Sequence, residues 1–359
     1  MRLDRLWLTD FRNYTTAELE PDPEGLTVIR GTNGQGKTNL LEAVSYLATL
    51  ESFRGAPREA LVRRGAERAV VRAEASRDGR LLLLEAELPL NGRDRYLLNR
   101  QPLRRGRDLL GALRVSVFAP EDLHLVQAGP AGRRDLLDGA LVALHPRNDA
   151  LRSDLDRVLR QRGALLRQCD GRFDADAEAT LDVWDAKLSE LGSRWADLRE
   201  EVSVSLSPLV SDYFGRLTSA APQLSLTYRR SWEGRLGDAL LVSRREDLRR
   251  GVTTIGPHRD ELDIQLADMP ARTHASQGEQ RGVALALRLG VHSLVGTVVG
   301  SPPVLLLDDV FSELDPVRSA ALLCLLPAGQ SLLTTAGPLP EGSVPSLVVS
   351  VGAGEVRAG

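Results

Sequence analysis

Lysine is nearly missing from this 359-residue chain: Lys37 and Lys187 are the only two among 46 basic residues, so 44 are arginine. Cysteine is equally scarce, with two isolated residues, Cys169 and Cys324. Two such cysteines supply neither a disulfide framework nor a zinc site, and they indicate a protein of the reducing cytoplasm. In a chain that avoids lysine this strongly, each remaining lysine is a candidate for a specific role.

The sequence also has no long apolar run and no strong excess of charge. No stretch of about 18 apolar residues occurs, and residues 1–10 alternate charged and apolar side chains, so we expect neither a membrane span nor a signal peptide. The formal net charge is −3. Any contact with nucleic acid must therefore come from a local basic patch. The length and a hydrophobic content of 42% suit two domains with a buried core.

The order of apolar patterns predicts an α/β head that is interrupted by helices. Strands are expected at 1–10, 26–30 and 113–118, a helix at 39–50, and two or three antiparallel strands within 70–98. The second half of the chain is expected to hold helices at 277–294 and 316–326 and strands at 224–229, 252–255, 262–266, 304–307, 331–335 and 347–351. We predict a head of residues 1–120 plus 220–359 and an inserted helical arm of residues 121–219.

Helical patterns dominate the predicted arm. Helices at 131–144 and 148–168 precede a polar turn at Asp170–Gly171. An apolar stripe then recurs at alternating spacings of three and four residues: Leu181, Trp184, Leu188, Leu191, Trp195, Leu198 and Val202. Such a heptad stripe predicts an antiparallel, coiled-coil-like hairpin, roughly 30–45 Å long at 1.5 Å per residue. A simple layer of two helices on the core is the alternative.

The motif with the clearest chemistry is Gly31-Thr32-Asn33-Gly34-Gln35-Gly36-Lys37-Thr38, which fits G-x-x-x-x-G-K-[ST] in full. Its glycines allow positive φ angles, so that successive backbone N–H groups can point at phosphate oxygens. Lys37 is expected to reach the β- and γ-phosphates of ATP, and Thr38 to ligate Mg²⁺. This loop and the following Asn39 are the predicted nucleotide-binding residues. A glycine-rich surface turn is the alternative, but the loop stands between a predicted strand and a predicted helix, as the motif requires.

An acidic element follows later, where the apolar strand Val304-Leu305-Leu306-Leu307 ends in Asp308 and Asp309. A buried strand can hold Asp308 rigidly beside the phosphate loop as a ligand of Mg²⁺, directly or through water. Asp309 would face the γ-phosphate and orient or activate the attacking water. Lys37 and Asp309 are thus the predicted catalytic residues. The alternative is an acidic turn that caps the next helix, but the presence of a phosphate loop in the same chain favours the metal-binding interpretation.

Further motifs follow the order found in ABC-type ATPases: Ser276-Gln277-Gly278-Glu279-Gln280 before the acidic strand and Ser312-Glu313-Leu314-Asp315 after it. The chain also carries Phe11-Arg12-Asn13-Tyr14, Gly129-Pro130 with Arg133-Arg134, and Gly256-Pro257-His258-Arg259-Asp260. With these strings the whole chain resembles the RecF family of bacterial DNA replication and repair proteins, within the SMC class of P-loop ABC ATPases.

The resemblance implies a slow, Mg²⁺-dependent ATPase that dimerises head to head around two ATP molecules. The signature residues Ser276, Gly278 and Gln280 would then serve the nucleotide of the other subunit, with Asp315 at the dimer seam. Arg12 and Asn13 are further expected nucleotide-binding residues. The implied task is recombinational repair in the cytoplasm at the nucleoid: a clamp on duplex DNA near single-strand gaps that helps load RecA with RecO and RecR.

This chain departs from the general ABC pattern in three places. Asp309 stands where many relatives have glutamate, and the shorter side chain should position water less well, which predicts slow turnover. No switch histidine follows residues 332–335. A clear Q-loop glutamine is also missing, which leaves Glu121 or Gln127 as candidates. The role of His258 stays open.

Clusters of arginine are the candidate DNA contacts. Seven arginines lie from Arg93 to Arg114 and six from Arg54 to Arg72. Such clusters neutralise phosphates with little regard for base sequence, although a solvated arginine-rich face is the alternative.

Three other functions are considered. A transporter ATPase subunit is disfavoured by the interval of about 240 residues between the phosphate loop and Ser276. A short SMC-like chromosome-structure ATPase and an ATP-binding clamp with negligible turnover remain.

Overall fold

The computed structural model describes residues 1–169, 175–218, 223–352 and 354–358. Contacts divide the chain into two compact units, one of Met1–Leu123, Asp212–Ala221 and Ser276–Gly359, the other of His124–Ser211 and Pro222–Ala275. The predicted head included residues 220–275, whereas the segment from Pro222 to Ala275 groups with the second unit. The predicted turn at Asp170–Gly171 lies outside the described residues.

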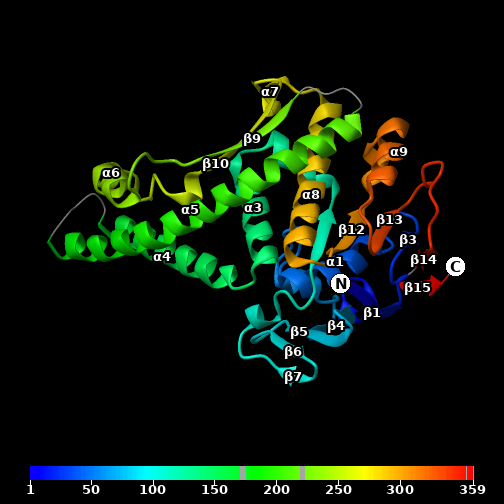
Figure 1. The fold of residues 1–359 in the computed structure, drawn as a ribbon. Coiled ribbons are helices and arrows are strands. Elements are labelled where there is room, and N and C mark those ends of the chain that lie inside the picture. The colour runs from blue at the N-terminus through cyan, green and yellow to red at the C-terminus, as the bar shows by residue number, and fades with distance from the viewer. Residues whose placement is uncertain (170–174, 219–222, 353, 359) are drawn as a thin grey trace. The chain divides into compact units, whose positions relative to one another are not determined.

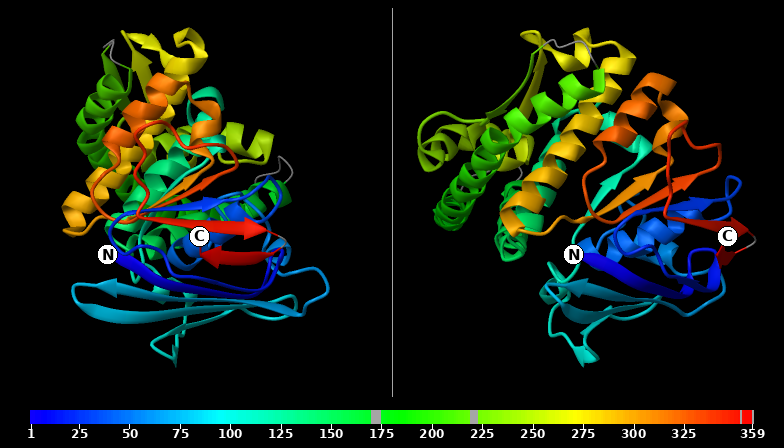
Figure 2. Two further views of the ribbon diagram at one scale, coloured as in Figure 1. Left: turned by 90° about the vertical axis from the view of Figure 1, so that its right-hand side faces the viewer. Right: turned by 45° about the vertical axis from the view of Figure 1, so that its right-hand side comes forward.

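Two six-stranded sheets form the first unit, and helix α1 (Lys37–Thr49) packs against strands of both (Figures 1 and 2). The antiparallel sheet has the order β2-β1-β4-β5-β6-β7, with β1 (Arg2–Phe11), β2 (Tyr14–Leu19), β4 (Arg68–Arg77), β5 (Arg80–Pro89), β6 (Arg95–Leu98) and β7 (Gln101–Pro102). The other sheet has the order β15-β14-β3-β13-β12-β8, with β3 (Leu26–Arg30), β8 (Val115–Phe118), β12 (Val304–Asp308), β13 (Ser331–Thr335), β14 (Leu347–Gly352) and β15 (Glu355–Ala358). Apart from β15 this sheet is parallel, so the carboxyl ends of β3, β13 and β12 share one edge.

Helices α8 (Gln277–Val299) and α9 (Pro316–Leu325), with the end of α5 (Ala175–Thr218), complete the larger elements of the first unit. Short helical turns are η1 (Arg58–Leu61), η2 (Gly106–Leu109), η3 (Pro120–Leu123) and η5 (Val310–Glu313). By length and composition α8 could cross a membrane, so the expectation that no segment could do so was too strong. However, 61% of its apolar window is buried inside the structure, as in the core helix of a folded domain.

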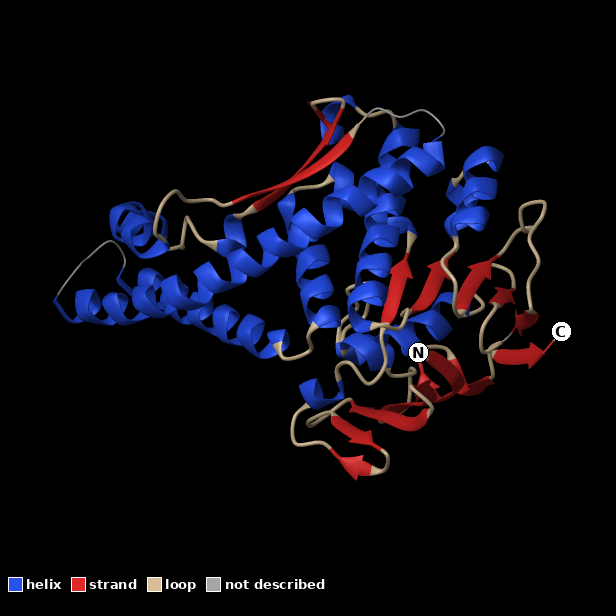
Figure 3. Cartoon of the chain, viewed as in Figure 1, coloured by secondary structure: helices blue, strands red, loops and turns tan. Residues whose placement is uncertain are grey.

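The second unit is mainly helical, with a three-stranded antiparallel sheet (Figure 3). Its elements are α2 (His124–Gln127), α3 (Pro130–Leu144), α4 (Asn148–Cys169), most of α5, β9 (Leu224–Arg229), α6 (Leu236–Arg250), η4 (Pro257–Arg259), β10 (Glu261–Leu266), β11 (Met269–Pro270) and α7 (Ala271–His274). Sequence patterns missed α6, and the predicted strand at 252–255 was wrong. The backbone and hydroxyl of Thr254 donate to the Asp247 carboxylate, which holds this segment against the end of α6 instead.

Only part of the predicted heptad stripe is buried on α5. Leu181, Leu188, Trp195 and Val202 are buried, whereas Trp184, Leu191 and Leu198 are half-buried. In each of these three places the next residue along the helix is the buried one: Asp185, Gly192 and Arg199. Polar and small residues therefore alternate with the apolar ones, and α5 lacks the continuous apolar seam of a regular coiled coil.

A buried ion-pair network accounts for the grouping of residues 222–275 with the helices. Arg162 on α4 is fully buried and donates to Asp185 at 2.6 Å, Asp247 at 2.7 Å and Thr253 at 2.8 Å. Arg244 on α6 donates to the other oxygen of Asp185 at 2.7 Å. Because a buried charge without its partners is costly, these contacts fix α6 and the segment after it to α4 and α5.

We predict that Asp247→Ala lowers the free energy of unfolding by roughly 3–5 kcal/mol, because it leaves the buried Arg162 without one of its two carboxylate partners. Urea unfolding can be followed by tryptophan fluorescence, since Trp184, Trp195 and Trp232 all lie in the second unit. The control is Asp154→Ala, which breaks the exposed pair with Arg157 and should cost less than about 1 kcal/mol. Equal losses in the two variants would contradict a stabilising role of the buried network.

Candidate nucleotide-binding site

The phosphate loop connects β3 to α1, and two of its glycines are required by geometry. Gly36 has a φ of 107°, and a Cβ there would lie 2.5 Å from the side chain of Asn13. A Cβ on Gly31 would lie 2.3 Å from the carbonyl oxygen of Val351. A side chain at Gly36 would thus collide with the turn between β1 and β2, and one at Gly31 with β14, so the loop can take this path only with glycine.

Lys37 is the first residue of α1 and its side chain folds back into the loop. Its Nζ donates to the carbonyl oxygens of Gly31 at 2.7 Å and Thr32 at 3.0 Å, and the residue is only 7% exposed. The ammonium group is therefore held within the concave side of the loop by backbone oxygens, where a phosphate would meet it. The exposed residues of the loop, Thr32, Asn33 and Gly34, form its outer rim.

Thr38 and Asp308, predicted to share a metal ion, are joined directly. The Thr38 hydroxyl donates to Oδ1 of Asp308 at 2.8 Å. Thr334, at the end of the strand between β3 and β12, donates to the same oxygen at 2.6 Å. The carboxylate is buried and is oriented by two hydroxyl groups from neighbouring elements. Sequence reasoning missed Thr334, because the pairing of its strand with the acidic strand appears only in the folded sheet.

Burial sets the electrostatics of Asp308. Burial raises the pKa of this carboxyl, the hydroxyls of Thr334 and Thr38 oppose that change, and the carboxylates of Glu121 and Asp309 act with burial. Of the two Q-loop candidates, Glu121 is therefore one whose charge acts on the Asp308 carboxyl. The other candidate, Gln127, belongs to the second unit.

Asp309 sits in a left-handed turn, with a φ of 46°. Its backbone N–H donates to Oγ1 of Thr334 at 3.0 Å and to the Thr334 carbonyl oxygen at 3.2 Å. An aspartate can adopt this conformation more readily than most residues. The turn sends the chain away from the sheet directly after Asp308, so the two adjacent carboxylates differ in environment.

The predicted contacts of Arg12 and Asn13 with nucleotide take a different form in the structure. Arg12 makes two hydrogen bonds to the fully buried Glu42 of α1, at 2.6 and 2.7 Å. Asn13 donates to the carbonyl oxygen of Gln35 at 2.9 Å and accepts from the amide of Asn39 at 2.7 Å. Arg12 thus anchors the segment to α1, while Asn13 braces the phosphate loop and the start of α1.

The signature residues lie at the start of α8. Ser276 caps the helix and accepts from the backbone N–H of Glu279 at 3.3 Å, while the Glu279 carboxylate accepts from the backbone and hydroxyl of Ser276 at 2.7 Å. Gln280 is buried in the first turn, and Asp315 caps α9. Among the residues that the structure describes, no hydrogen bond joins Ser276, Gly278 or Asp315 to the phosphate loop.

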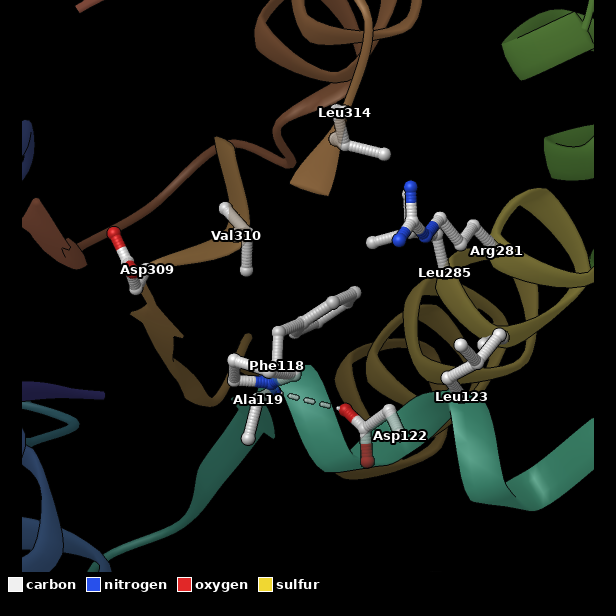
Figure 4. Close-up of a pocket in the computed structure, with 11 residues that line it drawn as sticks. Phe118, Ala119, Asp122, Leu123, Arg281, Leu285, Asp309, Val310 and Leu314 are labelled. Carbon is white, nitrogen blue, oxygen red and sulfur yellow. Dashed lines mark hydrogen bonds between the residues drawn. The ribbon is translucent and has the colours of Figure 1, made fainter. Parts of the chain in front are cut away.

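A shallow hollow that is open to solvent lies next to Asp309 (Figure 4). Its apolar wall comes from Phe118, Leu285, Val310 and Leu314, and Arg281 of α8 lies on the opposite side from Asp309. It therefore borders the strand β8, the signature helix and the turn after the acidic strand.

The remaining motif, Gly256 to Asp260, lies in the second unit. His258 contacts the carbonyl oxygen of Thr253 at 3.0 Å, and burial lowers its pKa to about 4. Asp260 accepts a hydrogen bond from Tyr228 and one from the backbone of Ser231 at 2.7 Å. Within the second unit this motif binds the segment after α6 to β9.

We predict that Thr334→Val slows ATP hydrolysis by about 10-fold or more, because it removes one of the two hydroxyls that orient Asp308 and the side-chain acceptor of the Asp309 N–H. Single-turnover hydrolysis and the Mg²⁺ concentration for half-maximal rate should both change, while affinity for ATP stays near that of the wild type. Thr334→Ser should restore both. The control is Thr335→Val, whose lost hydroxyl bonds the Gly337 backbone instead; a wild-type rate in Thr334→Val would rule out the positioning role.

Comparisons with known proteins agree with this geometry. The model of the RecF/RecN/SMC N-terminal domain matches residues 2–332. The DNA replication and repair protein RecF of Acidothermus cellulolyticus is 42% identical over 355 residues, which cover 95% of each chain. RecF of Streptomyces avermitilis is also 42% identical, over 94% of this chain and 93% of that protein.

Solved structures give the same result at the level of the fold. The structure of the recombination mediator protein RecF-ATP in the RecFOR pathway has a TM-score of 0.91 at 29% identity and covers 99% of this chain and 97% of that one. An SMC head bound to the C-winged helix domain of ScpA has a TM-score of 0.60 at 15% identity, a likeness of fold alone. The predicted fold class, an ABC-type ATPase head with a helical arm, is thereby confirmed, and the chain belongs to the RecF family of DNA replication and repair proteins.

Proposed function

We propose that this chain is an ATP-dependent DNA clamp of recombinational repair, which closes as a homodimer on ATP and is released by slow hydrolysis. The observation that carries the proposal is the direct hydrogen bond between Thr38 and Asp308 beside a loop that holds Lys37 inward. This arrangement supports a phosphate site in which Asp308 would serve as the metal-binding carboxylate. Full-length relatives named for DNA replication and repair support the DNA-repair context.

The oxygen donors at this point suit Mg²⁺. The hydroxyl of Thr38 and the carboxylate of Asp308 are hard oxygen ligands within hydrogen-bond distance of each other. Mg²⁺ in nucleotide sites uses one or two protein carboxylates together with phosphate oxygens and water, so a cage of several acidic residues is not needed. When bound, the ion would neutralise phosphate charge. Thr38 and Asp308 would hold it, and the hydroxyl of Thr334 would keep the Asp308 carboxylate in its orientation.

The remaining residues of the site would bind the phosphates of ATP or orient the attacking water. The backbone N–H groups of the loop and the ammonium group of Lys37 would bind the β- and γ-phosphates. Asp309 would orient the attacking water as a general base. Its left-handed turn is held at the backbone by Thr334, but its side chain is one methylene shorter than that of glutamate, which is consistent with slow turnover.

The signature segment completes the site only from a second copy. Among the described residues, Ser276 and Asp315 make no hydrogen bond to the phosphate loop, and we propose that they instead meet the nucleotide held by Lys37 of a partner subunit. The order of the motifs along this chain supports a head-to-head homodimer with two shared ATP molecules. The alternative of an SMC-like role in chromosome structure draws on the same fold, but the SMC head described above is 15% identical to this chain, against 42% for RecF of Acidothermus cellulolyticus.

Sedimentation with ATP tests the shared site. We expect wild type to be monomeric without nucleotide and dimeric with ATP, and Asp309→Asn to stay dimeric for longer because it binds ATP without hydrolysing it. Lys37→Met should remain monomeric and lose ATP-dependent DNA binding. If neither wild type nor Asp309→Asn dimerises, the proposal that ATP is shared between subunits is wrong.

The structure narrows the candidate DNA contacts. Several arginines of the two clusters pair with carboxylates, among them Arg58, Arg63, Arg68 and Arg72, and Arg114 is buried. Arg104 and Arg105 are exposed in the segment after β7, and Arg107 in η2 is half-buried. We propose that this segment neutralises phosphates of duplex DNA near single-strand gaps, at the nucleoid in the cytoplasm, with RecO and RecR as partners in the RecFOR pathway.

Replacing Arg104, Arg105 and Arg107 singly by alanine should lower duplex affinity uniformly across sequences. Each phosphate that is no longer neutralised should reduce the slope of log affinity against log salt by about 1. Fluorescence anisotropy with a gapped duplex at several salt concentrations measures this slope. Arg72→Ala is the control, because Glu85 already neutralises that arginine. Slopes equal to wild type in all three variants would place the DNA elsewhere.

A further inference from the structure

Arg318 connects the signature segment to the acid at the predicted dimer seam. Its Nη1 donates to Oδ2 of Asp315 at 2.7 Å, and its backbone N–H donates to Oδ1 of the same carboxylate at 2.9 Å. The side chain remains 26% exposed. Its Nε is buried and has no hydrogen-bond partner among the described residues. The guanidinium group is therefore fixed in direction by one carboxylate while part of its bonding capacity is unused.

The same guanidinium group lies across Gly278. A Cβ added to Gly278 would lie 2.5 Å from Nη1 and 2.9 Å from Nη2 of Arg318. Gly278 has no positive φ, so its backbone conformation does not call for glycine. A side chain at residue 278 would therefore require the guanidinium group of Arg318 to shift.

The carboxylates around Arg318 indicate why a cation is needed on this surface. The surface formed by the starts of α8 and α9 carries two carboxylates, Glu279 and Asp315. The hydrogen bond from Ser276 lowers the pKa of Glu279, and the backbone hydrogen bond from residue 318 lowers that of Asp315, so both are ionised near neutral pH. Such a surface would repel a triphosphate unless it also supplied a cation. Arg318 supplies a positive charge between these two carboxylates.

We propose that Arg318, whose guanidinium group lies against Gly278, contacts the γ-phosphate of the ATP held by the other subunit. Asp315 acts as the positioning residue that holds the guanidinium group toward the partner. The planar group, with its several N–H donors, suits an anionic phosphate oxygen better than a flexible ammonium group. This inference rests on the homodimer described under the proposed function and assigns a residue to its shared site.

The test is a double-mutant cycle on ATP-dependent dimerisation of the full chain. With adenylyl imidodiphosphate and Mg²⁺, we expect Arg318→Gln and Gly278→Ala each to raise the dimer dissociation constant by about 10-fold or more, and the double variant to be within about 2-fold of Arg318→Gln. Because an alanine at 278 would act by displacing Arg318, its effect should vanish once the arginine is gone. Affinity of the monomer for a fluorescent ATP analogue should stay at the wild-type value in all variants.

Arg249→Gln is the matched control, since Arg249 also pairs with a carboxylate three residues earlier, on α6 of the second unit. It should leave dimerisation unchanged. Wild-type dimerisation by Arg318→Gln, or effects of the two substitutions that multiply, would overturn the role of Arg318 while leaving the clamp intact. If wild type itself does not dimerise with the analogue, the homodimer fails, and the inference fails with it.

Discussion

The nucleotide site depends on a single buried carboxylate held by two hydroxyl groups. Asp308 ends one parallel strand, Thr334 lies one residue before the end of the next, and Thr38 is in the first turn of the helix that follows the third. Burial penalises the charged form of Asp308, and the two hydroxyls offset part of that penalty. A rigid, partly desolvated carboxylate of this kind stays in position when a metal–nucleotide complex arrives, which removes reorganisation from the catalytic step.

In the phosphate loop near Asp308, the backbone passes so close to neighbouring residues that two positions have no room for a Cβ atom. Gly36 turns with positive φ against Asn13, and Gly31 passes under Val351. At the other half-site, Gly278 leaves room for Arg318. Glycine therefore has two distinct uses here: in the phosphate loop it permits the backbone path, and in the signature segment it accommodates a charged side chain. The proposed clamp combines a cation on each side of the nucleotide, Lys37 in one subunit and Arg318 in the other.

The second unit follows a different principle. Its long helix α5 alternates apolar residues with buried polar ones, and Arg162, Asp185 and Asp247 form a buried network where a coiled coil would have leucines. Such a network adds little net stability compared with apolar packing. It does require each buried charge to meet its partner, so it specifies how the three helices pack. It joins α6 to α4 and α5, which precede it in the chain. The motif around His258 belongs to this packing.

The sequence alone determined the phosphate loop, the acidic strand and their order, because each is a local pattern whose spacing has a direct chemical reason. Strands such as β3, β9 and β13 were also predicted with their observed limits, since short apolar runs between turn residues are local signals. Local patterns could not reveal Thr334 beside Asp308, Glu42 under Arg12, or Arg318 over Gly278. The grouping of residues 222–275 with the arm was hidden for the same reason. These contacts join segments distant in the chain, and only the tertiary structure decides which side chains share a buried space.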